Sequence, residues 1–292
     1  MKQELKYTLY PCENPKAAVF MIHGMEEHRK RYDGFARFLN EHGYAAVTYD
    51  LPGHGETAEG GTLGYFGDNG WNKLIVSAVE MAQLTRREFP DVPLVLFGHS
   101  MGTMIARCFL QNYDYLVDAV ILSGAPNYNP GAVVGRQMAL DRVRISGPKS
   151  HSKILDGLAT GQFNRKIERP RTAVDWLSYN EENVDNYISD PLCGVPFTVS
   201  GYYDLFDGMM RMADEDRYYR MNTGIPILFV AGQEDPCTGG ESGFRSSVSF
   251  LKDVGYRTID TILYPGMRHE ILHEKKADTV MNDIVSWLQE HI

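Results

Sequence analysis

The sequence predicts an α/β fold in which a mostly parallel sheet has helices on both faces and carries an inserted helical cap. Three observations support this prediction. Short, almost continuous apolar runs alternate with longer helix-like segments, one long stretch interrupts that alternation, and a length of 292 residues suits one large domain with an insertion. In such a sheet the chemistry lies in the loops beyond the carboxyl ends of the strands.

The expected elements follow one another along most of the chain. Each expected strand is a short run of apolar, β-branched or aromatic residues. The expected strands cover residues 17–22, 45–49, 94–97, 119–122, 227–230 and 258–264. The expected helices cover residues 31–42, 71–89, 101–112 and 277–291. A loop rich in glycine and proline is expected at residues 51–70.

The long interruption lies between about residues 125 and 222. Its apolar residues lose strand character, and Tyr, Met, Trp and Phe become frequent. We interpret residues 125–222 as a helical cap inserted between two strands, so that residues 1–124 and 223–292 form the core. The alternative is that this stretch forms a second half of an ordinary core.

The composition excludes several classes of partner and compartment. The chain carries 29 Lys and Arg against 38 Asp and Glu, so a phosphate backbone is repelled on average, and no nucleic-acid partner is expected. The four cysteines form no C-x-x-C pair, which is typical of reduced thiols in a cytosolic protein. Residues 1–6 lack the apolar core of a signal peptide. We expect a cytoplasmic protein, which still allows transient contact with a membrane or micelle surface.

The motif G-H-S-M-G at residues 98–102 follows a buried strand and opens a helix. This is the context that a nucleophile elbow needs, because a sharp strand-to-helix turn lifts the serine hydroxyl above the sheet. Glycines flank the serine because side chains there would collide with neighbouring backbone. Ser100 is therefore the predicted nucleophile.

A serine nucleophile needs a base, and the base needs a carboxylate that orients it. Asp235 follows the strand at 227–230 and is the predicted acid, with Glu234 as its competitor. His269 follows the last strand and is the predicted base, with His273 as the alternative. Cys237 is either an inert core residue or a thiol close enough to His269 to confer sensitivity to thiol reagents.

The oxyanion hole is predicted at two backbone N–H groups. A loop after the first strand can aim the N–H of Met25 at the substrate oxygen, and Met101 begins a helix. His23 is expected to fix this loop by hydrogen bonds. Asp50 is expected to have a structural role, and a catalytic role for His54 is the less favoured interpretation.

One motif suggests a different chemistry. Residues 269–273 read H-E-I-L-H, which matches the H-E-x-x-H motif of zinc proteases. That motif needs the interior of a helix, but a Pro-Gly pair stands just upstream at residues 265–266 and the helix is expected from residue 277. We therefore predict no metal site.

With these motifs in place, the chain resembles the monoacylglycerol lipase and lysophospholipase branch of the α/β-hydrolases, a serine aminopeptidase-like family. The resemblance spans almost the full length. The residues that carry it are H-G-M-E-E-H at 23–28 with Arg31 and Tyr32, D-L-P-G-H-G at 50–55, the elbow at 98–102, G-Q-E-D-P at 232–236 and G-M-R-H-E at 266–270. In the cap, D-P-L-C-G at 190–194 and Y-Y-D-L-F at 202–206 look like bacterial members. Thr103 departs from the family, in which many members have a second glycine.

The resemblance implies a triad of Ser100, Asp235 and His269, no cofactor, and ester substrates with an apolar acyl chain. Hydrolysis would proceed through an acyl-enzyme on the serine. Two alternatives stay open at this stage. The same family name covers aminopeptidases, and a non-catalytic binding protein could use the same scaffold.

Overall fold

The computed structural model, which describes residues 4–292, is built on a seven-stranded sheet. The strands are β1 (Tyr7–Tyr10), β2 (Ala18–Ile22), β3 (Ala45–Tyr49), β4 (Leu94–His99), β5 (Ala119–Ser123), β6 (Ile227–Gly232) and β7 (Ile259–Tyr264). Their order across the sheet is β1-β3-β2-β4-β5-β6-β7. β1 runs antiparallel to β3, and every other described pair is parallel, so the predicted mostly parallel sheet is confirmed.

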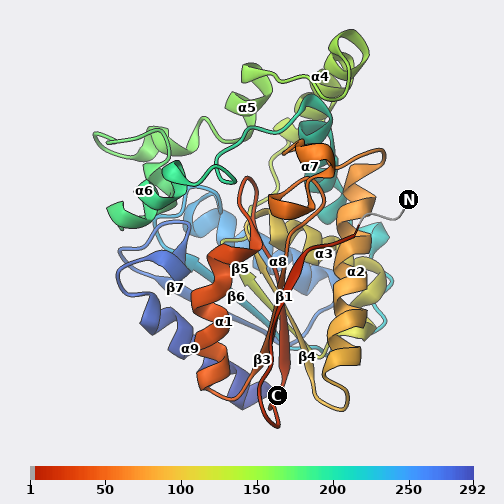
Figure 1. Ribbon diagram of the computed structural model, residues 1–292, viewed down its shortest axis with the longest axis vertical. Coiled ribbons are helices and arrows are strands. Elements are labelled where there is room, and N and C mark those ends of the chain that lie inside the picture. Colours follow the sequence, from red (N-terminus) through yellow and green to blue (C-terminus); the bar gives the residue numbers. More distant parts are fainter. Residues whose placement is uncertain (1–3) are drawn as a thin grey trace.

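Helices cover both faces of the sheet (Figure 1). They are α1 (Asp33–Glu41) and α9 (Ala277–His291) on one face, and α2 (Gly70–Glu88), α3 (Met101–Tyr113) and α8 (Gly240–Val254) on the other. In β4, Leu94 and Leu96 pack into one apolar core, whereas Val95 and Phe97 pack into the other. Since successive side chains of a strand point to opposite faces, a continuous apolar run is what this two-sided burial requires.

The order of the strands explains where a site can form. From β2 the chain moves outward to β3 and then crosses back, so that β4 lies on the other side of β2. The segments that follow β2 and β4 lead to α1 and α3, which lie on opposite faces of the sheet. The crevice between two such loops is the usual ligand site of an open parallel sheet.

Four helices stand between β5 and β6. They are α4 (Gly131–Ser146), α5 (Lys153–Ala159), α6 (Glu181–Ser189) and α7 (Val199–Met212). In Figure 1, α4, α5 and α6 lie beyond the carboxyl ends of the strands. α7 contacts α4 on one side and the core helices α2 and α3 on the other. Residues 125–222 contain helices and loops but no strand, in agreement with the predicted helical character of this insertion.

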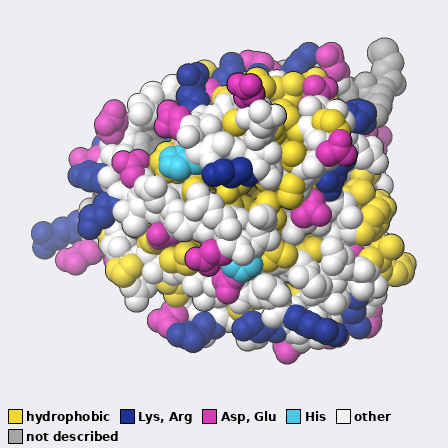
Figure 2. All heavy atoms as spheres, turned by 90° about the horizontal axis from the view of Figure 1, so that it is seen from below, with side chains coloured by type: hydrophobic (Ala, Val, Ile, Leu, Met, Phe, Trp, Pro, Cys, Tyr) yellow, Lys and Arg dark blue, Asp and Glu magenta, His cyan; other side chains and the backbone are white. Residues whose placement is uncertain are grey.

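The end of the molecule away from α4–α6 shows no segregation of charge. Figure 2 shows Lys and Arg side chains among Asp and Glu side chains on this face. Within residues 4–292, no helix combines the length and the apolarity needed to span a bilayer. The expectation that residues 1–6 are not part of a signal peptide rests partly on residues 1–3, which lie outside the described residues.

The packing of α7 on α2 predicts the effect of two glycine substitutions. A Cβ added to Gly208 of α7 would lie 2.2 Å from the ring of Trp71, whereas one added to Gly157 of α5 would meet no atom within 4 Å. We predict that Gly208→Ala lowers the free energy of unfolding by about 1–3 kcal/mol, because overpacking displaces α7 or the buried indole. Gly157→Ala, the control, should raise it by about 0.5–1 kcal/mol. Urea unfolding measures both, and equal stability of the two variants would contradict this packing.

Candidate active site

Ser100 occupies a strained turn between β4 and α3. Its backbone has φ 51° and ψ −119°, a region that residues other than glycine rarely adopt. Its N–H donates to the carbonyl of Ser123 in β5 at 2.9 Å. A Cβ on Gly102 would lie 2.2 Å from the carbonyl oxygen of Ile22, so α3 can approach β2 this closely only with glycine there. The structure therefore has the strand–turn–helix geometry predicted for the elbow.

Thr103, which departs from the family pattern, takes part in the same turn. Its hydroxyl donates to the carbonyl of Ser100 at 2.7 Å, and its N–H donates to the same oxygen at 2.8 Å. The side chain is fully buried. The threonine thus adds a hydrogen bond to the turn rather than a group that enters the cavity.

His269 and Asp235 are brought together although they lie far apart in the sequence. Nδ1 of His269 lies 2.8 Å from Oδ2 of Asp235, and both side chains are buried. The other carboxylate oxygen of Asp235 accepts from the N–H of Cys237 at 2.8 Å. Burial lowers the pKa of His269, but the charge of Asp235 and its hydrogen bond more than offset this, so that the pKa stands above its ordinary 6.5.

His273 and Glu234, the alternatives to the predicted base and acid, have other hydrogen-bond partners. Nε2 of His273 contacts the carbonyl of Arg31 at 3.0 Å, and Glu234 accepts from the hydroxyl of Tyr179. Residues 271–273 form a short 3-10 turn rather than the interior of an α-helix. The two histidines of the H-E-x-x-H motif therefore do not face one metal position.

The loop after β2 approaches Ser100 closely. A Cβ on Gly24 would lie 3.1 Å from the Cβ of Ser100, and Met25 and Ser100 line the same cavity. The N–H of Gly24 donates to Oε1 of Glu27 at 2.5 Å. His23 contacts the carbonyl of Gly24 at 2.8 Å and accepts from the N–H of Leu51 at 3.0 Å, which agrees with its expected structural role.

Asp50 and His54 lie in the next loop and have structural contacts. Asp50 accepts from the N–H groups of Arg29 and Glu56, both at 2.8 Å, and pairs with the Arg29 guanidinium. The ring of His54 stacks on Phe66 at 5.3 Å, and burial lowers its pKa to about 3. A neutral imidazole stacked in the core agrees with the expectation that His54 is not catalytic.

A buried ion network supports the loop after β2 and the loop that carries His269. The sequence analysis did not predict this network. Arg31 donates to Glu27 at 2.9 Å and to Glu270 at 2.8 Å, and it also donates to Asn183 of α6 at 3.0 Å. Burial raises the pKa values of both carboxyls, but Arg31 more than offsets this and holds both below their ordinary range. Because Glu27 holds Gly24 and Glu270 adjoins His269, one guanidinium ties the two loops together.

Part of this site faces one cavity of about 430 Å³. Its wall includes Ser100, His269, Met25 and Met101, together with many side chains from the 125–222 stretch. The apolar part of that wall includes Met104, Leu158, Phe163, Leu205, Phe206 and Met209. The ring of Trp176 lies 5.0 Å from the ring of His269. The stretch between β5 and β6 therefore forms one wall of the cavity and contacts the histidine directly.

Two groups of side chains could reach a metal ion within the described residues. In the first, Asp235, Cys237 and His269 have ligand atoms within 4.8 Å of one another. Burial raises the pKa of the Cys237 thiol, which keeps it protonated, while a hydrogen bond with Ser100 opposes this shift. The cysteine thus lies close to His269, and both interpretations of its role stay predictions.

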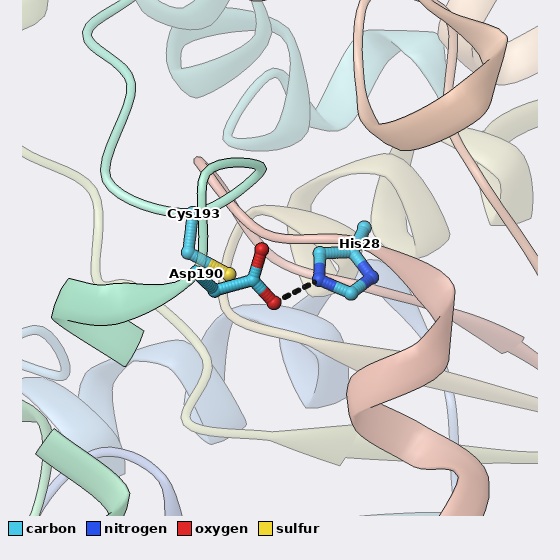
Figure 3. A group of neighbouring side chains, drawn as sticks. All are labelled: His28, Asp190 and Cys193. Atoms are coloured by element: carbon cyan, nitrogen blue, oxygen red, sulfur yellow. Dashed lines mark hydrogen bonds and ion pairs between the residues drawn. The ribbon is translucent and has the colours of Figure 1, made fainter. Parts of the chain in front are cut away.

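The second group is His28, Asp190 and Cys193 (Figure 3). Nε2 of His28 and Oδ2 of Asp190 contact each other directly at 2.8 Å, whereas two ligands of a tetrahedral zinc lie about 3.3 Å apart. Burial raises the pKa of the Cys193 thiol, which favours its neutral form. This geometry is that of a polar contact that joins the loop after β2 to the segment after α6.

Comparisons with known proteins agree with this site. A family model described as serine aminopeptidase, S33, matches residues 13–276. The chain belongs to this family. Together with the relatives described next, this match confirms the prediction of an α/β-hydrolase similar to the monoacylglycerol lipases and that of a serine hydrolase of carboxylic esters.

Individual relatives support the same conclusion. The monoglyceride lipase of Mus musculus is 25% identical over 97% of this chain and 85% of its own length. The monoacylglycerol lipase of Mycolicibacterium smegmatis is 24% identical over 97% of this chain and 91% of its own. A thermostable carboxyl esterase from Bacillus coagulans, solved in complex with glycerol, is 28% identical and has a TM-score of 0.92, with 99% of this chain and 95% of that chain covered.

Proposed function

We propose that this hydrolase cleaves monoacylglycerol- or lysophospholipid-like esters through an acyl-enzyme on Ser100. The observation that carries the proposal is the convergence of three groups on one largely apolar cavity: the strained serine, the His269–Asp235 pair and the loop of Met25. Relatives named monoglyceride lipase support this substrate class.

In the proposed mechanism His269 removes the proton of Ser100 as the hydroxyl attacks the ester carbonyl. Asp235 orients the imidazole and stabilises its charged form. The N–H groups of Met25 and Met101 receive the oxyanion, and Met101 is suited to this because the first N–H groups of a helix have no partner within it. His269 then protonates the leaving alcohol and later activates the water that releases the acid.

We further propose that residues 125–222 act as a cap on a core of residues 1–124 and 223–292. The cap supplies Leu205, Phe206 and Met209 to the cavity wall, and flexible apolar side chains suit an acyl chain. A cytoplasmic location is part of the same proposal, because the cysteines are free.

The aminopeptidase alternative requires a carboxylate that is free to hold a substrate amino group, and four carboxylates that the sequence offers for this role are poorly suited: Glu26, Glu27, Asp204 and Asp207. Glu27 pairs with Arg31, Asp207 pairs with two arginines, and Asp204 accepts from the N–H of Trp71. Burial and the nearby charge of Asp156 raise the pKa of Glu26 to about 8, so that Glu26 is neutral at pH 7. The charges of this site therefore favour an ester substrate.

We predict that Ser100→Ala lowers kcat for esters by about 10⁴-fold or more, because the acyl-enzyme can no longer form. Ser77→Ala, at a buried serine of α2 remote from the cavity, is the control and should keep full activity. Hydrolysis of 4-nitrophenyl esters from two to sixteen carbons, alongside amino-acid nitroanilides, measures both variants. Serine-dependent cleavage of nitroanilides without ester preference would replace the proposed substrate with peptides.

The raised pKa of His269 predicts the acid limb of the pH profile. The base must be neutral, so activity is lost as the pH falls through a pKa above 6.5. In Asp235→Asn the main group that raises the pKa of His269 is lost, while the burial that lowers this pKa remains. The midpoint of the residual activity should therefore move below pH 6.5. Profiles of kcat/KM for a soluble ester test this, and identical midpoints in the two proteins would contradict it.

A further inference from the structure

The indole of Trp176 lies against the imidazole of His269 in a contact that the proposed mechanism does not use. The two ring centroids are 5.0 Å apart and the ring planes are inclined by 38°, which is closer to a stacked than to an edge-on arrangement. Both residues line the active-site cavity. The face of an indole attracts a cation within about 6 Å of the ring centroid, and it does so more strongly than the face of Tyr or Phe.

His269 carries a positive charge twice in each proposed turnover, first when it takes the proton of Ser100 and again when it activates water. Its side chain is 2% exposed, so fixed groups of the protein rather than water must stabilise this charge. The anionic groups that do so are Asp235, which is hydrogen-bonded to the ring, and the nearby carboxylates of Glu270 and Glu27.

Two further titratable groups close to the ring are neutral at pH 7. The ring of His99 lies 4.7 Å from that of His269, and burial lowers the pKa of His99 to about 4. The thiol of Cys237 also lies close to His269, and burial raises its pKa. The indole of Trp176 adds the negative face of a π system to these surroundings without adding a charge or a proton acceptor.

The main chain on both sides of this indole is bonded to the loop of the base. The carbonyl of Leu177 accepts from the N–H of Glu270 at 2.8 Å, and the carbonyl of Asp175 accepts from the guanidinium of Arg268 at 2.7 Å. The two donors are the direct neighbours of His269 in the sequence. Hydrogen bonds of the chain therefore hold the two rings together, in addition to the packing of the rings themselves.

Contacts within the 125–222 stretch also hold Trp176. Its backbone N–H donates to Oδ1 of Asn164 at 3.1 Å, and its ring lies 4.8 Å from the ring of Phe163. The side chain is half-buried. The fold itself thus sets the place of the indole beside the imidazole, and a group that is already in place stabilises a developing charge without reorganising at that moment.

We propose that Trp176 is a positioning residue for the base, and that its indole holds the imidazole of His269 in place and stabilises the imidazolium. The proposal deepens the proposed function and rests on it, because it needs His269 to act as the base. From the usual strength of a cation–π contact, loss of the indole should slow turnover about 5- to 30-fold.

The first test compares W176L, which keeps an apolar side chain but removes the π face, with the conservative variant W176F. The substrate is 4-nitrophenyl acetate, because its small acyl group makes little use of the cavity wall. We expect W176L to lower kcat by this factor with little change in KM, and W176F to stay within about threefold of the wild type. A raised KM with unchanged kcat in W176L would make Trp176 a substrate contact and overturn the proposal.

The acid limb of kcat/KM distinguishes stabilisation of the charge from mere covering of the ring. Loss of the indole should lower the pKa of His269, so that the midpoint falls by about 0.7–1.5 pH units, which is the same 5- to 30-fold effect. If the indole only kept water away, its removal would expose the ring to water and raise this pKa. An unchanged or raised midpoint would therefore contradict the proposed role.

Y179L is the matched control. Tyr179 lies in the same segment and is 40% exposed, and its ring lies 3.8 Å from the guanidinium carbon of Arg268. The variant thus removes an aromatic ring that lies on the base loop at the arginine rather than at the imidazole. It should keep the kcat and the midpoint of the wild type. A shift as large as that of W176L would assign the effect to attachment of the segment and not to the indole.

NMR titration of Ser100→Ala protein makes the test independent of turnover. The signal of His269 is the one that is missing after H269Q, and its pKa is compared with and without W176L. We expect a lower pKa in the presence of W176L. An unchanged pKa, with serine-dependent ester hydrolysis by the wild type, would refute only the role of Trp176. A lowered pKa, with no ester hydrolysis by the wild type, would refute only the proposed function.

Discussion

The position of Arg31 between Glu27 and Glu270 is the interaction on which the site most depends. It joins the loop after β2, the loop of His269 and helix α6, which are far apart in the sequence. Removing one partner from such a buried pair costs about 3–5 kcal/mol, because a charge is left buried without compensation. The network therefore links the loop of Glu27 to the loop of Glu270 and attaches α6 to both.

The stretch between β5 and β6 contacts the loop after β2 and the ring of His269. The carbonyl of Glu26 accepts from the N–H of Gly194 at 2.9 Å and from the hydroxyl of Tyr187 at 3.1 Å, while Trp176 lies against His269. A movement of this segment would therefore alter the backbone beside Met25 and the surroundings of the base together.

The strands β2 to β7 and the loops with Ser100, Asp235 and His269 could be predicted because each depends on a local pattern, an apolar run or a turn. α8 was missed, although Phe244, Val248 and Leu251 recur at helical spacing, because serines between them weaken the apolar signal. The ion network could not be predicted, since Arg31 and Glu270 are 239 residues apart.

The acyl-enzyme on Ser100 is the central claim, and its direct test is peptide mapping by mass spectrometry. Wild-type protein is mixed with a 4-nitrophenyl ester of a medium-chain acid, quenched in acid within the first turnover and digested. The account predicts one acyl group on the peptide that contains Ser100, formed together with the first equivalent of nitrophenol. An acyl group on Cys237 instead, or turnover without any acylated peptide, would contradict it.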